Sequence, residues 1–179
     1  KHITTVDGGL LLCKSADDFK RGKLLRWYGI DRDTPRKDFR CEENIIEYGY
    51  KFHMNDICAT IGIEQLKYAD ALISKHSHNA QRYDVELKNL KKFKLIPKDP
   101  ENFSSSWLYT LHTQNRDDFM KYMSDNSVVT SKVHERNDLH DAFADSKVSL
   151  PGVSKFCETQ ISIPVGWWLS DDEMDFIIN

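Results

Sequence analysis

The sequence has few of the features that define several classes of protein. Its 179 residues include only four cysteines, and no two of them form a Cys-x-x-Cys pair, so neither a disulfide framework nor a zinc site is indicated. A net charge of −3 offers no electrostatic surface for nucleic acid or an anionic membrane. No apolar run approaches the roughly 20 residues of a membrane span. We therefore expect no nucleic-acid or membrane partner, and the isolated thiols predict a reducing, cytoplasmic compartment.

Motifs of several enzyme classes are missing as well. The sequence contains no G-x-S-x-G nucleophile motif and no phosphate-binding P-loop. His76 and His78 stand two positions apart in a predicted helix, so they point to different faces and form a poor metal pair. The paired aspartates stand at predicted helix starts, where carboxylates favour the helix dipole. We expect no metal site.

The composition is that of a globular protein, with 40% hydrophobic and 30% charged residues. The length allows one ordinary domain or one and a half small ones. The chain opens on Lys-His-Ile-Thr-Thr, without an initiator methionine or a polar tail. We expect it to be a piece of a longer polypeptide.

Hydrophobic periodicity outlines the secondary structure. The apolar run Leu10–Cys13 predicts a short buried strand, and a helix is predicted over Asp17–Tyr28. One long helix, or two with a bend, is predicted from Asn55 to about Leu90. The rest of the sequence alternates between short strands and short helices. Strands are predicted over Phe93–Ile96, Trp107–Thr113, Val128–Val133 and Gln160–Pro164, and helices over Arg116–Ser124, Leu150–Thr159 and from Ser170 onward.

The opening segment carries the most chemistry. Lys1 precedes a threonine-rich turn with two glycines, Gly8 and Gly9, which feeds the predicted strand. A lysine amine partly desolvated at such a turn can form a Schiff base with a carbonyl compound. A solvated lysine at a chain end is the alternative.

Four segments in this order resemble motifs of the DegT/DnrJ/EryC1/StrS family of pyridoxal-phosphate sugar-nucleotide aminotransferases. They are Lys1–Gly9, Leu24–Gly29, Gly49–Gly62, and Ile161–Pro164 with Leu169–Glu173. The resemblance implies an α/β fold, that of a fold-type-I pyridoxal-phosphate transferase. It implies that residues 1–72 are the C-terminal part of the cofactor-binding large domain and that residues 73–179 form a small α+β domain with a long linking helix.

The resemblance also implies roles for individual residues. Lys1 would be the catalytic lysine, forming the Schiff base with pyridoxal 5'-phosphate and moving the proton during transamination. Lys51 and His53 lie in a segment that reaches the partner's cofactor phosphate across a dimer in this family. Lys51 stands where the family has asparagine, and His53 stands where it often has arginine. A solvated loop cation is the alternative for Lys51.

Substrate-binding residues are expected in two segments. Tyr28, beside Trp27, lies where the family approaches its substrate, so this aromatic pair could stack on a sugar or base, or pack at a helix end. His134, Arg136 and Asn137 lie in a polar segment that the resemblance places near the substrate. Arg136 could hold pyrophosphate oxygens bidentately. A polar surface loop is the alternative for this segment.

The implied activity is transfer of an amino group from glutamate to a nucleotide-linked keto sugar, of the 4-keto-6-deoxy kind that gives perosamine or viosamine. The implied partner is a second copy of the chain, because the family shares its site across a homodimer. Dehydratase relatives carry histidine in place of the lysine, and Lys1 argues against that activity. A pyridoxal-phosphate-binding regulatory or sensory relative, or an inactive half-chain without turnover, is the alternative.

Overall fold

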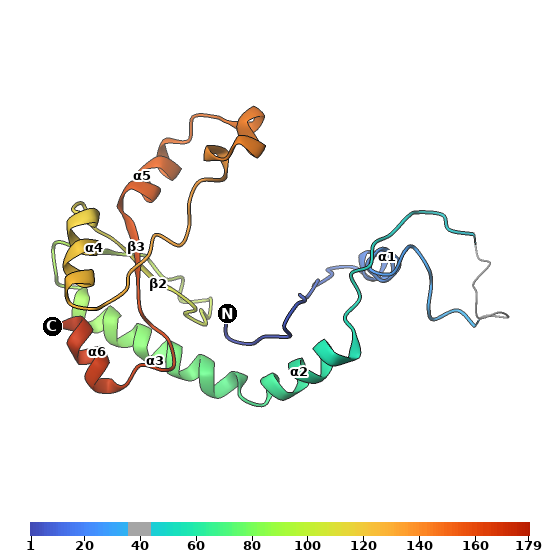
Figure 1. The fold of residues 1–179 in the computed structure, drawn as a ribbon, viewed down its shortest axis with the longest axis horizontal. Coiled ribbons are helices and arrows are strands. Elements are labelled where there is room, and N and C mark those ends of the chain that lie inside the picture. Colours follow the sequence, from blue (N-terminus) through green and yellow to red (C-terminus); the bar gives the residue numbers. More distant parts are fainter. Residues whose placement is uncertain (36–43) are drawn as a thin grey trace. The chain divides into compact units, whose positions relative to one another are not determined.

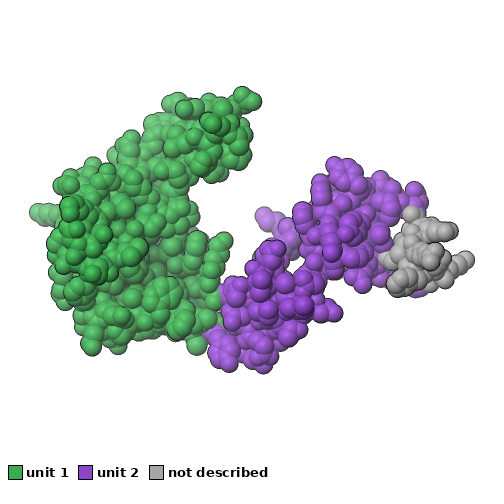
Figure 2. All heavy atoms as spheres, viewed as in Figure 1, with its two compact units in different colours: residues 1–2, 69–179 green, residues 3–68 purple. Residues whose placement is uncertain are grey.

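The computed structural model describes residues 1–35 and 44–179 (Figure 1), which divide into two units (Figure 2). Unit 2 is Ile3–Tyr68, and unit 1 is Ala69–Asn179 together with Lys1 and His2. The division falls close to the predicted boundary between residues 72 and 73. It stays a prediction that the first part belongs to a large domain and that the second part is a small domain. The sequence gives no sign that Lys1 and His2 belong to unit 1.

Unit 1 is built on a three-stranded antiparallel sheet and helix α3 (Ala69–Leu87). Strand β2 (Tyr109–His112) is central, between β1 (Lys94–Leu95) and β3 (Gln160–Ile163). Every residue of β3 is buried. The hydrophobic core joins these strands to α3 and the C-terminal segment. Its members are Ala80, Tyr83, Leu87, Tyr109, Leu111, Ile161, Ile163, Val165, Leu169 and Met174.

Unit 1 also contains two short 3-10 helices, η1 (Asn137–Leu139) and η2 (Asp141–Ser146), and three further α-helices. The α-helices are α4 (Arg116–Asp125), α5 (Pro151–Thr159) and α6 (Asp171–Ile178). Helix α6 begins at a capping box, in which Ser170 accepts from the Glu173 amide while the Glu173 carboxylate accepts from the Ser170 amide.

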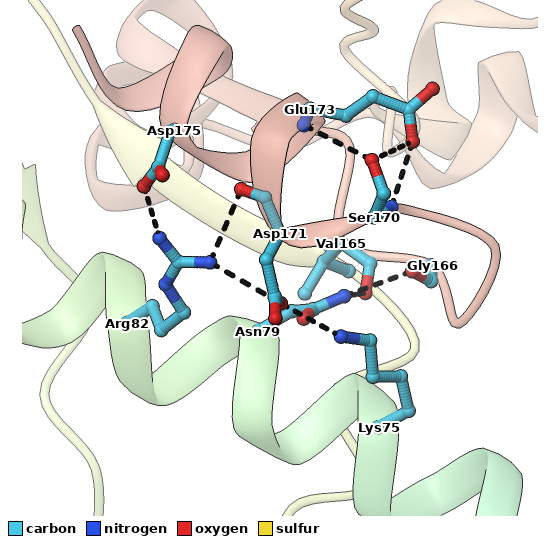
Figure 3. A network of polar contacts seen from close by, with 9 residues as sticks. All are labelled: Lys75, Asn79, Arg82, Val165, Gly166, Ser170, Asp171, Glu173 and Asp175. Atoms are coloured by element: carbon cyan, nitrogen blue, oxygen red, sulfur yellow. Dashed lines mark hydrogen bonds and ion pairs between the residues drawn. The ribbon is translucent and has the colours of Figure 1, made fainter.

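Ion pairs join α6 to α3, as Figure 3 shows. Arg82 pairs with Asp175 and with Asp171, and Lys75 reaches the same Asp171 carboxylate at 3.1 Å. Both aspartates are exposed to solvent, so each ion pair alone contributes little to the stability of the fold. Deeper in the same contact, the amide of Asn79 donates to the carbonyls of Val165 and Gly166, at 3.3 and 3.0 Å.

Unit 2 contains helices α1 (Ala16–Leu25) and α2 (Asp56–Leu66). Side chains cap both N-termini, those of Ser15 and Asn55. Neither helix buries a hydrophobic side chain. The apolar side chains of this unit are largely exposed, up to 91% for Leu10 and 94% for Ile46.

Two predicted strands are wrong. Leu10–Cys13 is irregular, because no described segment supplies a neighbouring strand. Val128–Val133 forms a single bridge, Ser131 to Ser162, in place of a strand. The predicted long helix is two helices, α2 and α3, separated by Lys67 and Tyr68. Within the described residues, no helix is long and apolar enough to cross a membrane.

We predict that Asn79→Leu destabilises the fold by about 2–4 kcal/mol, because it leaves two buried carbonyls without a donor. Chemical denaturation of the full-length protein measures this loss. The matched control is His78→Ala, one position earlier and exposed, which is expected to change stability by less than about 0.5 kcal/mol. Equal effects of the two substitutions would refute the role of Asn79.

Candidate functional site

Lys1 lies in unit 1, where its amine sits over the ring of Trp107, 5.2 Å from the centroid. The side chain is exposed, and none of the described carboxylates forms an ion pair with it. A cation over an indole face is held weakly and directionally. The amine is therefore placed by an aromatic surface and stays accessible to a carbonyl compound.

The residue after Lys1 is docked against α3. The ring of His2 meets the ring of His76 edge to face, with 4.5 Å between centroids. Both nitrogens of His2 are shielded from solvent, and the nearby backbone of Ser105 does not reach hydrogen-bond geometry with them. His76 is only 3% exposed, and its Nδ1–H donates to the carbonyl of Ser106 at 3.1 Å.

Burial sets the protonation of these rings. It lowers the pKa of His2 and of His76 below the ordinary value, because an imidazolium loses hydration there. The His2 ring also lowers the pKa of His76. Both imidazoles are therefore neutral at neutral pH.

Three of the predicted residues gather around Trp27 in unit 2. Lys51 pairs with Trp27 in an antiparallel bridge, and the amide of Tyr28 donates to the carbonyl of Tyr50 at 3.1 Å. The ring of His53 lies 3.9 Å from that of Trp27, and the ring of Tyr28 lies 4.9 Å from it. The structure thus brings Tyr28, Lys51 and His53 to one place.

A glycine makes this arrangement possible. Gly29 has a left-handed φ of +79°, and a Cβ there would lie 2.1 Å from the Glu47 carbonyl oxygen. Only glycine fits so close an approach of two backbone segments. The chain therefore turns directly after Tyr28.

The surroundings of Trp27 are rich in cations. A small cavity of about 20 Å³ is lined by Lys23, Arg26, Trp27, Ile30, Asp31, Arg32 and His53. The Nδ1 atom of His53 is buried and has no hydrogen-bond partner among the described residues. A buried ring nitrogen of this kind fits a hydrogen bond to an anionic ligand group such as phosphate.

The polar segment of unit 1 holds the remaining predicted residues. The guanidinium of Arg136 pairs with both oxygens of Asp138, and its third nitrogen donates to Ser154 at 2.6 Å. These hydrogen bonds lower the pKa of Asp138. His134 and Asn137 are exposed, and the His134 carbonyl accepts from the side chain of Gln160 at 3.0 Å.

Arg136 also lines a larger open cavity of about 540 Å³. The other lining residues are Gln114, Ser149, Leu150, Pro151, Ser154, Lys155, Glu158 and Thr159. Its guanidinium charge is already matched by Asp138. The predicted contact between Arg136 and pyrophosphate therefore requires an exchange of partners.

Sequence reasoning missed Trp107 and His76 as neighbours of Lys1. The sequence predicts that Trp107 belongs to a strand, and the spacing of His76 and His78 indicates only that they form a poor metal pair. Neither interpretation carries a signal that could have found the contact, because about a hundred residues separate Lys1 from Trp107 along the chain.

The whole chain, residues 1–179, matches the model of the DegT/DnrJ/EryC1/StrS aminotransferase family. AtS13 from Actinomadura melliaura is a solved structure with 33% identity and a TM-score of 0.92, covering 99% of this chain and 47% of its own. The sugar aminotransferase CalS13 from Micromonospora echinospora has 32% identity and a TM-score of 0.85, covering 92% and 44%.

A curated relative from Campylobacter jejuni is named UDP-4-amino-4,6-dideoxy-N-acetyl-beta-L-altrosamine transaminase. It is 30% identical over 111 residues, which are 62% of this chain and 28% of the relative. The chain spans about half the length, or less, of the relatives it matches. The likeness to the solved structures establishes the α/β fold of the fold-type-I pyridoxal-phosphate transferases.

We predict that acid destabilises unit 1 through its buried histidines. Burial lowers the folded-state pKa of His2, His76 and His112 below the ordinary value of 6.5. The unfolded chain therefore takes up protons first as the pH falls through 6.5, and stability present above that value is lost toward the folded-state pKa values. The thermal unfolding midpoint should decrease as the pH is lowered from about 7.5 to about 5.5. A midpoint that is constant or rises over this range would contradict the prediction.

Proposed function

This chain belongs to the DegT/DnrJ/EryC1/StrS aminotransferase family, and from that premise we propose that the protein transfers an amino group from glutamate to a nucleotide-linked keto sugar. The observation that carries the proposal is the Lys1 amine, exposed and unpaired among the described residues, on the face of Trp107. A nucleophilic amine needs such access to reach a carbonyl carbon.

The aminotransferases of the family depend on pyridoxal 5'-phosphate, and the residues of this chain fit that group. The Lys1 amine would hold its aldehyde carbon. Lys51 and His53 would hold its phosphate, which the buried, unpartnered Nδ1 of His53 supports. When bound, the cofactor supplies an electron sink for the carbon that loses its proton.

Lys1 has a second role in this account. Once its amine is free, Nζ would take a proton from the α-carbon of the amino donor and would return it to the cofactor carbon that Lys1 had held. Beside Lys1, the ring nitrogens of His2 are shielded from solvent and the ring of His76 is buried.

We propose a nucleotide sugar of the 4-keto-6-deoxy kind as the acceptor. The Campylobacter jejuni relative supports this choice, because its printed name describes a 4-amino-4,6-dideoxy sugar nucleotide. Tyr28, His134, Arg136 and Asn137 would contact the substrate. Pyrophosphate would take the place of the Asp138 carboxylate on Arg136, since both groups accept two parallel hydrogen bonds from a guanidinium.

The proposed assembly is a homodimer with a shared site in the cytoplasm. The exposed apolar side chains of unit 2, among them Leu10, Leu12 and Ile46, support a contact surface in that unit. In the family the segment of Lys51 and His53 reaches the partner's cofactor, and the dimer would bring that segment to the second site.

We predict that borohydride reduction of the full-length protein with pyridoxal phosphate places a pyridoxyl group on Lys1. Peptide mass mapping locates the group. Lys1→Ala removes it, whereas Lys75→Ala, which changes an ion-paired lysine of the same unit, leaves it in place. An unmodified Lys1 in the presence of excess cofactor would overturn the proposal.

Turnover separates the enzyme from a regulatory relative. Addition of glutamate to the loaded protein should convert the bound cofactor to its aminated form, with a change in the absorption spectrum. A protein modified at Lys1 but spectrally unchanged by glutamate would be a cofactor-binding protein with a sensory or regulatory role.

A further inference from the structure

The contact between Lys1 and Trp107 is held at both ends by one side chain. Trp107 directly follows Ser106, whose backbone is left-handed with a φ of +50° although Ser106 is not a glycine. This rarely adopted conformation persists only where the surroundings hold it. The Nδ1–H of His76 does so by donating to the Ser106 carbonyl at 3.1 Å.

The other end of the contact is Lys1, whose neighbour His2 packs on the same imidazole. The two rings meet edge to face at 82°, with 4.5 Å between centroids. On another side of His76 lies the ring of Trp168, at 6.1 Å and 86°. The imidazole of His76 is thus enclosed, and His76 is only 3% exposed.

Helix α3 also holds the backbone that precedes Trp168. Asn79, one turn after His76 on the same buried face, donates to the carbonyls of Val165 and Gly166. These residues precede the two tryptophans, and Figure 3 shows the amide of Asn79 directed at their carbonyls. The backbone that leads to Trp168 is therefore tied to the same helix face as His76.

We propose that His76 is a positioning residue, which sets the Lys1 amine over Trp107 by holding the Ser106 carbonyl and the His2 ring at once. A lysine side chain has four rotatable bonds, and an exposed contact with an indole is weak. Such a contact persists only if the backbone at both of its ends is fixed. This inference rests on the proposed function for the importance of Lys1, and on the contacts of unit 1 for its geometry.

The test is the proton resonance of the Lys1 ε-methylene in full-length protein stripped of pyridoxal phosphate and labelled with ¹³C-lysine. The face of Trp107 shifts this resonance upfield, and Trp107→Leu defines its position without the ring. We expect His76→Ala to move the resonance most of the way to that position. His76→Phe keeps a ring against His2, and His76→Asn keeps a donor for Ser106, so each should retain part of the shift.

The matched controls change neighbours that lack these contacts. His78→Phe, on an exposed position of α3, and Trp167→Leu, in the turn beside Trp168, should leave the Lys1 resonance in place. A second readout is the pKa of His2, which burial lowers and which should rise toward 6.5 in His76→Ala. The resonances of His112 report whether each variant is folded.

The outcome separates this inference from the proposed function. A Lys1 resonance that stays shifted in folded His76→Ala, or that moves equally in His78→Phe, overturns the role of His76. A wild-type protein with the shifted resonance but without a pyridoxyl group on Lys1 after borohydride supports the positioning and overturns the proposed function.

Discussion

Buried polar side chains on one face of α3 hold the rest of unit 1 in place. His76, Asn79 and Tyr83 follow one another at helical spacing, and each donates to backbone carbonyls of a segment distant in the sequence. Burial raises the pKa of the Tyr83 phenol, so it remains a donor to Pro164 at 2.7 Å. A buried carbonyl without a donor costs more than a hydrogen bond gains, so the three contacts specify the arrangement as well as stabilise it. The surfaces around Lys1 depend on this face, because Ser106 and the turn before Trp168 are among the segments that it holds.

Unit 2 is organised differently. Its described part has backbone bonds around Trp27 and a close approach at Gly29, but its apolar side chains are exposed. The cations Lys23, Arg26 and Arg32 line the same small cavity as His53, together with Asp31, and the Nδ1 atom of His53 has no hydrogen-bond partner among the described residues. Unit 2 therefore presents apolar side chains and polar groups to a ligand or to another protein surface, whereas unit 1 contains the hydrophobic core. The proposed enzyme uses both properties, because the reacting amine of Lys1 needs a rigid support and the phosphate needs donors without competing partners.

Local signals predicted the helices well, but two of the five predicted strands are wrong, Leu10–Cys13 in unit 2 and Val128–Val133 in unit 1. Ser170 and Glu173 predict the start of α6 correctly, because a capping box involves only residues that are close in the sequence. Leu10–Cys13 was predicted to be a strand from its apolar run, yet a strand also requires a partner, which no local pattern supplies. The candidate site divides in the same way. Four motifs in order, the first beginning at Lys1, indicate the family, whereas the contacts of Lys1 with Trp107 and of His2 with His76 depend on tertiary packing between segments far apart in the sequence.

The central claim is that Lys1 is the residue that carries the cofactor in this protein. A crystal structure of the full-length protein grown with pyridoxal phosphate tests it most directly. We expect continuous electron density from the Lys1 Nζ atom to the cofactor, with Trp107 beside the lysine and a phosphate oxygen bonded to the Nδ1 atom of His53 from one of the two copies. Density for the cofactor on another lysine, or a phosphate held without His53 and Lys51, would contradict it.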